Sequence, residues 1–207
     1  MKVKTLFLIC FLSITCLLNA ADKPVIQIHT DNSSLIFRIA DNGRLYQSYL
    51  GKKLSHETDI SHLPHGTEAY ITHGMEDYFE PAIHILHNDG NPSLLLKYVS
   101  HETKAVSQGV NETIITLGDD KYPVTVKLHY VIYPAEDIIK TYTEISHKEK
   151  KPVVLHQYAS SMLHLNRAKY YLTEFAGDWA HEANISDQPL EFGKKVLDTK
   201  LGARANM

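Results

Sequence analysis

The stretch VTVKLHYVIYP, residues 124–134, decides the fold class. Apolar side chains recur at every second position from Val124 to Ile132, and polar side chains such as Lys127 and His129 stand between them. Successive side chains of a β-strand point to opposite faces of a sheet. The alternation therefore predicts a strand with one buried face and one exposed face.

Further strands are predicted on both sides of this stretch. Their residue ranges are 25–29, 35–40, 94–99, 112–117, 138–145, 153–158 and 169–175. Turn-forming sequences separate them: DNG at Asp41, NDGNP at Asn88 and GDDKYP at Gly118. No segment has a helical period of useful length. Many short strands at regular spacing are typical of an antiparallel β-sandwich, so the predicted fold class is all-β.

Two longer stretches, 55–87 and 177–202, interrupt the strand pattern and are predicted to be irregular. Long loops on a rigid β-scaffold are where binding residues usually lie. Functional residues are therefore expected in these two stretches.

The composition is that of a soluble globular protein. The chain has 207 residues, of which 43% are hydrophobic and 22% charged, with a net charge of −3. This length is enough to form one sizeable core. Basic residues do not cluster in the way that nucleic-acid binding requires, so a nucleic-acid partner is not expected.

The first residues have the pattern of a secretory signal peptide. Lys2 and Lys4 precede the apolar run 6–18, and the small residues of NAAD follow it. We expect residues 1–21 to be removed near Ala20 and the mature protein to be secreted or periplasmic. The apolar run is short for a bilayer span, so the mature protein is expected to have no membrane segment. An uncleaved membrane anchor is the alternative.

Both cysteines, Cys10 and Cys16, lie inside the predicted signal peptide. The mature protein is therefore expected to have no disulfide and no cysteine metal site. A lipoprotein anchored through Cys16 is a further alternative, but Thr15 fits poorly as the residue before the modified cysteine.

Histidine spacing does not predict a metal site or a cofactor. His62 and His65 are three residues apart, as are His84 and His87, but no third ligand stands at a fixed spacing from either pair. Hydrogen-bonded or solvated loop histidines are the expectation. The sequence also contains no serine-hydrolase elbow, phosphate-binding loop or dinucleotide fingerprint.

The stretch GMEDYFEPAIH, residues 74–84, combines acidic and aromatic side chains. Asp77 stands beside Tyr78 and Phe79. Carboxylates accept hydrogen bonds from sugar hydroxyls and aromatic rings cover the apolar face of a sugar, so this composition suits carbohydrate binding. The alternative is a loop whose aromatic residues close one end of the sandwich.

The stretch EFAGDWAHEA, residues 174–183, contains the only tryptophan of the chain, Trp179. Gly177 and Asp178 are predicted to end the preceding strand, which would place Trp179 at the mouth of a loop. A sugar-stacking position and a place in the sandwich core are both open for Trp179.

Three segments resemble the N-terminal domain of glycoside hydrolase family 36, the bacterial α-galactosidases. They are EDYFEPAIHI, YYLTEFAGDWAHEANI and LEFGKKVLDTKLGARANM, and they occur in the order that the family has. The resemblance implies a β-super-sandwich followed by a catalytic (β/α)₈ barrel and a small C-terminal β-domain. Residues 22–207 are then expected to be an incomplete N-terminal domain. The catalytic aspartates belong to the barrel, so no catalytic residue is expected in this chain.

The resemblance also implies substrate-binding residues. Asp77 corresponds to an acid that binds the substrate, and Trp179 to an aromatic residue that contacts it. Family members can form tetramers, in which Asp77 would serve the pocket of a neighbouring subunit. Two positions depart from the family, because His181 and Phe79 stand where an arginine is common. A guanidinium offers a fixed fork of donors that these side chains lack.

Three functions follow as hypotheses. The first is the N-terminal part of an α-galactosidase that hydrolyses terminal non-reducing α-D-galactose residues. Its partners would be galactosides such as raffinose-type oligosaccharides, the catalytic barrel of the full-length enzyme and, in a homo-tetramer, other subunits. The second is a free-standing carbohydrate-binding β-sandwich without enzymatic activity. The third is a structural β-domain without a ligand.

Overall fold

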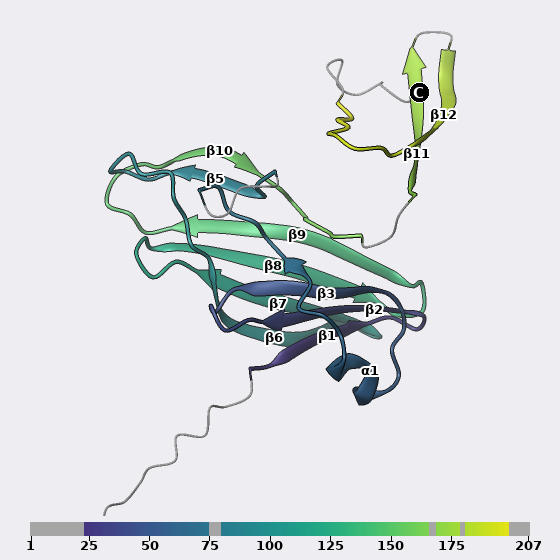
Figure 1. Ribbon diagram of the computed structural model, residues 1–207, viewed down its shortest axis with the longest axis horizontal. Helices are drawn as coiled ribbons and strands as arrows, with labels where there is room; N and C mark the ends of the chain where they lie inside the picture. The colour runs from purple at the N-terminus through teal and green to yellow at the C-terminus, as the bar shows by residue number, and fades with distance from the viewer. Residues whose placement is uncertain (1–22, 75–79, 166–168, 179–180, 199–207) are drawn as a thin grey trace, which may run out of the picture. The chain divides into compact units, whose positions relative to one another are not determined.

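The computed structural model describes residues 23–74, 80–165, 169–178 and 181–198 (Figure 1). The chain forms two compact units, Met1–Met162 and Leu163–Met207. The first unit is a sandwich of antiparallel sheets, and the second is built on a β-hairpin. The predicted all-β fold class is confirmed. Within the described ranges, no helix is long and apolar enough to cross a membrane.

The first four-stranded sheet has the order β1-β2-β3-β4. Its strands are β1 (Val25–His29), β2 (Ser33–Ile39), β3 (Leu45–Lys52) and β4 (Thr67–Glu68). The predicted DNG turn joins β2 to β3, where the Gly43 N–H donates to the Ala40 carbonyl. Gly43 has φ +80, a backbone conformation that glycine adopts readily.

The second four-stranded sheet has the order β6-β7-β8-β9, with every neighbouring pair antiparallel. Its strands are β6 (Lys97–Ser107), β7 (Val110–Gly118), β8 (Val124–Tyr133) and β9 (Ile138–His147). Strand β8 is the alternating stretch that predicted the fold class. It lies between β7 and β9, so both of its edges are hydrogen-bonded.

The two sheets face each other and bury a common apolar core (Figure 1). Phe37 of β2 contacts Tyr130 of β8 across the sandwich, with ring centroids 5.2 Å apart. Both strands contribute alternate residues to this layer, as their sequence pattern requires. Core side chains from the two sheets include Ile26, Ile28, Leu35, Phe37, Ile115, Leu117, Val124, Val126, Leu128 and Tyr130.

The expected exposed face of β8 is only partly exposed. Thr125 and Lys127 are half-buried, but His129 and Val131, which point the same way, are buried. The prediction of an exposed face is therefore wrong for the second half of this strand. Side chains of the neighbouring strands β7 and β9 cover His129, which a single strand's pattern does not reveal.

The stretch 55–87, predicted to be irregular, contains regular structure. It holds the one-turn helix α1 (Glu57–Ser61), the short strand β4 and strand β5 (Ile83–Leu86). Strand β5 pairs with β10 (Val154–Tyr158), far away in the sequence. The prediction fails here because these elements are too short to show a period and are stabilised by contacts with distant segments.

The second unit contains β11 (Tyr171–Asp178) and β12 (His181–Pro189), which pair antiparallel. The sequence predicted that Gly177 and Asp178 end the first strand and that 177–202 is irregular. The strand does end at Asp178, with its pairing interrupted at Gly177, but the prediction for 177–202 is wrong, because β12 lies within that stretch. Pairing of Asp178 with His181 extends the hairpin, and an irregularity between Ala176 and Asp178 accommodates the glycine.

Candidate functional site

Residues 75–79, which include Asp77 and Phe79, lie outside the described residues. Its described flanks are Gly74 and Glu80. The Gln157 side-chain amide donates to Glu80 Oε1 at 3.2 Å and to the Pro81 carbonyl at 2.8 Å. Gln157 belongs to β10, so its hydrogen bonds attach Glu80 and Pro81 to the β5–β10 sheet.

Three histidines form a row beside the same flanks. The ring centroids of His73 and His84 are 3.8 Å apart, and those of His84 and His156 are 4.8 Å apart. His84 lies in β5 and His156 in β10, while Thr72, next to His73, forms a parallel bridge with Ile83 of β5. The pairing of these three neighbouring segments therefore places the imidazoles side by side.

The histidine row gives hydrogen-bonding groups rather than a metal centre. Its rings are stacked or tilted against one another at interplanar angles of 23° and 34°. Imidazoles bind a metal in the plane of the ring, so stacked rings do not converge on one ion. In the described parts of the chain, no group of three His, Cys, Asp or Glu residues is arranged to hold a metal ion.

Gly74, the residue before the Asp77 segment, packs against the loop that contains Ser93. Its φ is +85, and a Cβ at this position would lie 3.1 Å from Ser93 Oγ and 3.3 Å from Ser93 Cα. The backbone conformation and this close approach both favour glycine. Ser93 therefore packs directly against the residue that precedes the Asp77 segment.

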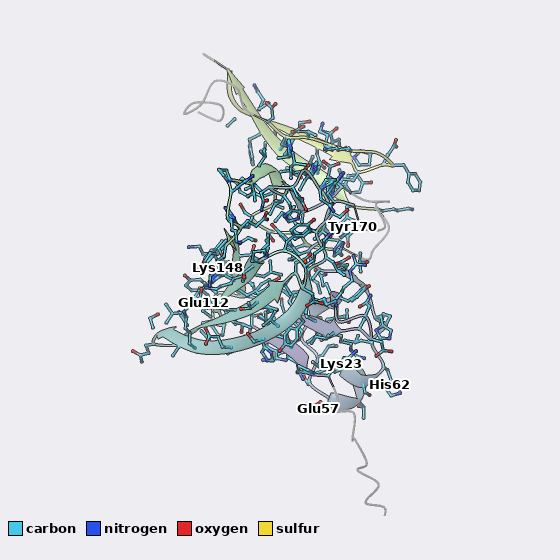
Figure 2. All side chains as sticks on the ribbon, turned by 90° about the vertical axis from the view of Figure 1, so that its left-hand side faces the viewer. Lys23, Glu57, His62, Glu112, Lys148 and Tyr170 are labelled. Carbon is cyan, nitrogen blue, oxygen red and sulfur yellow. The ribbon has the colours of Figure 1, made fainter. Side chains whose placement is uncertain are left out.

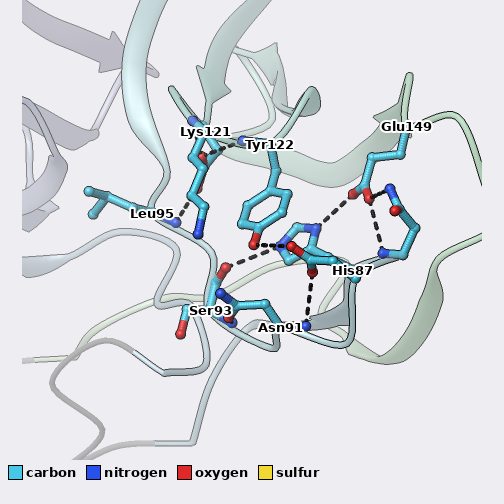
Figure 3. Close-up of polar contacts among 10 residues, drawn as sticks. His87, Asn91, Ser93, Leu95, Lys121, Tyr122 and Glu149 are labelled. Carbon is cyan, nitrogen blue, oxygen red and sulfur yellow. Dashed lines mark hydrogen bonds and ion pairs between the residues drawn. The ribbon is translucent and has the colours of Figure 1, made fainter.

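Ser93 is held in turn by a buried network around His87 (Figure 3). His87 Nε2 lies 3.1 Å from the Ser93 carbonyl oxygen, and His87 Nδ1 lies 2.7 Å from Glu149 Oε1. The ring of Tyr122 stacks on His87 with centroids 3.5 Å apart and an interplanar angle of 8°. The side chains of His87 and Glu149 are 0% and 1% exposed. The network joins three loops at one end of the sandwich.

The charge of Glu149 is stabilised within this network. Burial opposes its ionisation, but hydrogen bonds from His87 and from the Asn88 N–H outweigh burial and lower the pKa of Glu149. Asn88 also donates to Glu149 Oε2 through its side-chain amide. The ionised carboxylate has a donor for each oxygen, which a buried charge needs if it is to be stable.

Trp179 also lies outside the described residues. The neighbouring described residues Asp178 and His181 form the last pair of the β11–β12 ladder. On the hairpin, Tyr171 and Phe175 are 67% and 53% exposed. The second predicted site residue thus belongs to the unit Leu163–Met207, whereas Asp77 belongs to Met1–Met162.

Sequence reasoning missed the residues that support the predicted site. His87 was treated as an ordinary loop histidine, but it is buried and interacts with a residue 62 positions away. No motif in the sequence singles out His73 or His156. The sequence predicts a strand over 153–158, which corresponds to β10, but it predicts no strand at β5. Without the pairing of β5 with β10, the sequence does not indicate that the three histidines are neighbours.

The described residues thus form an antiparallel β-sandwich in the first unit and a β-hairpin with exposed aromatic residues in the second. Residues 42–206 match the family model described as the glycosyl hydrolase family 36 N-terminal domain. The chain belongs to glycosyl hydrolase family 36, and it is the N-terminal domain of that family that it matches. The resemblance stated from the three sequence segments is thereby confirmed.

Curated relatives of this chain are α-galactosidases. Probable alpha-galactosidase G of Aspergillus terreus is 23% identical over 147 residues, covering 65% of this chain and 20% of the relative. Alpha-galactosidase C of Emericella nidulans has the same identity and coverage. Probable alpha-galactosidase C of Aspergillus terreus is 22% identical over 204 residues, covering 87% of this chain and 27% of the relative. The chain therefore spans about a quarter of the length of these relatives.

Solved structures show the same fold. The family 36 α-galactosidase AgaA from Geobacillus stearothermophilus matches with a TM-score of 0.74 and 19% identity, covering 82% of this chain and 28% of AgaA. The galactosidase domain of the α-galactosidase-sucrose kinase AgaSK matches with a TM-score of 0.73, 20% identity and the same coverage. Substituted forms of AgaA have been solved with raffinose and with stachyose.

Proposed function

We propose that this chain is the N-terminal part of an α-galactosidase that hydrolyses terminal non-reducing α-D-galactose residues. The observation that carries the proposal is the family match over residues 42–206, which includes both Asp77 and Trp179. The α-galactosidase relatives support the reaction type, and the raffinose and stachyose complexes of AgaA support raffinose-type oligosaccharides as substrates.

In this proposal the chemistry itself belongs to another part of the enzyme. Retaining glycoside hydrolysis needs two carboxylates about 5 Å apart across the bond that breaks. The buried carboxylates Glu68, Glu112 and Glu149 are instead paired with basic side chains of their own sandwich. The catalytic carboxylates would be in the barrel of the full-length enzyme, and this chain would supply contacts to the substrate and to other subunits.

Asp77 and Trp179 would make the substrate contacts. A carboxylate at position 77 would accept hydrogen bonds from galactose hydroxyls, and the indole at position 179 would cover an apolar face of the sugar. The Gln157 contacts to Glu80 and Pro81 and the packing of Ser93 on Gly74 would hold the two flanks of the Asp77 segment. A bound sugar would then meet a loop whose ends are already fixed.

Export and assembly are part of the proposal. The basic and apolar start of the chain would direct secretion or transport to the periplasm, with cleavage near Ala20. A homo-tetramer would bring the Asp77 segment to a neighbouring pocket. Intact-mass measurement on exported protein tests the cleavage, and a mass that retains residues 1–18 would contradict it.

The central experiment has two stages. The purified chain is first assayed on an aryl α-galactoside, where no turnover above a heat-treated control is expected. The chain is then joined to the barrel and C-terminal domain of a family 36 relative, and Asp77→Asn and Trp179→Ala are compared with the unsubstituted fusion. Each substitution should lower kcat/KM at least tenfold, about 1.4 kcal/mol of transition-state binding, with little change in the thermal midpoint.

Matched controls separate binding from folding. Asp41→Asn changes an exposed aspartate and Tyr171→Ala an exposed aromatic residue, and both should leave kcat/KM unchanged. Turnover by the chain alone would show that the active site has been misplaced. A fusion in which neither Asp77→Asn nor Trp179→Ala affects kcat/KM would reject the proposed substrate contacts.

A further inference from the structure

The two outer strands of the second sheet differ in regularity. This sheet has the order β6-β7-β8-β9, so β6 and β9 each have one edge that faces away from the sheet. The ladder between β6 and β7 shifts its register at two places, between Tyr98 and Ser100 and between Ala105 and Ser107. The ladder between β8 and β9 instead runs evenly through all ten residues of β9, Ile138–His147. Since irregularities protect an edge strand from pairing with another strand, β9 is the less protected edge.

The outer edge of β9 has no strand partner among the described residues. In that part of the chain, the backbone of β9 forms a ladder with β8 alone, and none of the ten residues of β9 is buried. Ser160 comes close to β9, but its carbonyl accepts a hydrogen bond from the side chain of Thr143, not from the backbone. The sequence of β9 contains no proline or glycine that would oppose pairing. The edge is therefore a template for one more strand.

The sequence of β9 is a palindrome in which the two charged residues have opposite sign. From Ile139 to Ile145 it reads IKTYTEI. On each side of Tyr142 stand a threonine, then a charged residue, then an isoleucine. The charged residues are Lys140 and Glu144. Two copies of this strand, paired antiparallel about a two-fold axis at Tyr142, would therefore place each Lys140 directly opposite a Glu144.

Only one symmetric register pairs the opposite charges of this strand. With the axis at Tyr142, Lys140 faces Glu144 and Ile139 faces Ile145. An axis displaced by one residue to either side would place Tyr142 opposite Lys140 or opposite Glu144. An axis displaced by two residues would place two lysines or two glutamates opposite each other, which is destabilising. The sequence of β9 thus selects a second copy of itself, in one register, as its best partner.

The side chain at the centre of this register is already held in place. The Tyr142 hydroxyl donates to Glu112 Oε1 at 2.7 Å, and the Tyr142 ring stacks on His129 with centroids 4.3 Å apart. Figure 2 labels Glu112 on this sheet. Tyr142 is still 39% exposed, so part of its ring can contact the same residue of a second copy. A fixed side chain loses little conformational entropy on association.

The charged side chains of β9 lie on the solvent side of the sheet. Lys140 is exposed, and the side chain of Glu144 is 53% exposed. Within its own sheet, Glu144 Oε1 lies 3.3 Å from Lys127 Nζ of β8. In the register centred on Tyr142, each Glu144 carboxylate would lie between Lys127 of its own copy and Lys140 of the other. Opposite charges that face each other across neighbouring strands stabilise a sheet.

We propose that β9 pairs with β9 of a second copy of this chain, antiparallel and centred on Tyr142, so that the two second sheets form one continuous sheet. Each copy has one such edge, and the irregular β6 closes the other side, so the pairing ends at a two-fold dimer. The contact uses neither Asp77 nor Trp179 and does not depend on α-galactosidase activity.

The test measures the association of the purified chain by analytical ultracentrifugation. The unsubstituted chain should form dimers as its concentration is raised. Lys140→Glu and Glu144→Lys each place like charges opposite each other at both charged pairs, so each should weaken dimerisation at least tenfold. An equimolar mixture of the two variants should regain dimers, because both pairs of the mixed dimer again have opposite charges.

A matched control reverses a charge on the other outer strand. Glu102 is exposed on β6, and Glu102→Lys should leave dimerisation unchanged. Circular dichroism checks that each variant is folded. If a charge reversal on β9 prevents folding, the unsubstituted chain decides the question by NMR. On dilution of isotope-labelled protein, the backbone amides of residues 139–145 should shift, and those of β6 should not.

Three results would overturn the inference. They are a monomer at all concentrations up to the millimolar range, dimers that are as stable in Lys140→Glu as in the unsubstituted chain, and two folded variants whose mixture remains monomeric. The second result would assign the contact to another surface, such as the exposed apolar residues of the β11–β12 hairpin. Since these measurements use no substrate, their outcome is separable from that of the α-galactosidase proposal.

Discussion

The units Met1–Met162 and Leu163–Met207 use β-strands in different ways. In the first, Phe37 is 1% exposed and contacts Tyr130 of the opposite sheet. In the second, Phe175 is 53% exposed and Ile185, its partner across the hairpin, is 68% exposed. The comparison teaches that strand pairing alone does not bury apolar side chains. A second layer is needed, and the first unit supplies it from its own sequence.

This difference has an energetic consequence. A two-stranded hairpin is marginally stable at best, whereas two packed sheets remove many apolar side chains from water. We therefore expect the stability of this chain to reside in Met1–Met162.

The largest effect is expected from Phe37→Ala. Truncating a buried phenylalanine loses its transfer free energy and leaves a cavity, which typically costs about 3–5 kcal/mol of the free energy of unfolding. Urea denaturation monitored by circular dichroism measures the change. A loss below about 1 kcal/mol would show that the core between the two sheets is not packed as described.

A somewhat smaller effect is expected from Glu149→Gln. The substitution removes the charged acceptor of the buried His87 and Asn88 hydrogen bonds, and a hydrogen bond to a charged group contributes about 1.5–3 kcal/mol to the free energy of unfolding. The same urea experiment applies. Glu144→Gln is the matched control, because that carboxylate is 53% exposed and its ion pair with Lys127 should contribute less than about 1 kcal/mol.

A pH-dependent effect is expected from Glu112. Its pKa is lowered from 4.5 to about 2 in the folded protein, chiefly by the Tyr142 hydrogen bond. The folded state therefore binds fewer protons than the unfolded state between these values, so this stabilisation is present above pH 4.5 and is lost as the pH falls towards 2.

The Glu112 prediction is checked with urea midpoints measured across the same pH window. Glu112→Gln should flatten the dependence of stability on pH, and Tyr142→Phe should flatten it in part. Glu136→Gln, at an exposed turn, should leave the profile unchanged. An identical profile for the wild type and Glu112→Gln would reject the assignment.

The smallest effect is expected from Phe175→Ala in the hairpin. Because this ring is exposed, its removal should change the free energy of unfolding by no more than about 0.5 kcal/mol. Phe37→Ala and Phe175→Ala make the same chemical change, but Phe37→Ala should lower the free energy of unfolding several times more than Phe175→Ala. A loss of several kcal/mol would show that the hairpin face is buried in the folded protein.

The sequence alone predicted a large part of the fold. The alternation over 124–132 identified β8, and the DNG turn was correctly placed between two strands. Three segments were also enough to identify the family. These successes rest on local signals, since the period of a strand and the conformation of a turn depend on adjacent residues.

The residues around the candidate site are brought together by tertiary contacts rather than by local sequence. His87 interacts with Glu149 62 positions away, and the histidine row requires β5 to pair with β10. Asp77 and Trp179 came from the family resemblance and remain predictions, because both lie outside the described residues.

The outer face of the second sheet shows the same limit most clearly. The alternation of β8 correctly assigned the direction of His129, but it predicted exposure where the structure shows burial. A strand's own residues determine which way each side chain points. Only the register with β7 and β9 determines that Glu112 and Tyr142 meet His129 there, because cross-strand contacts depend on which segments pair and at what offset.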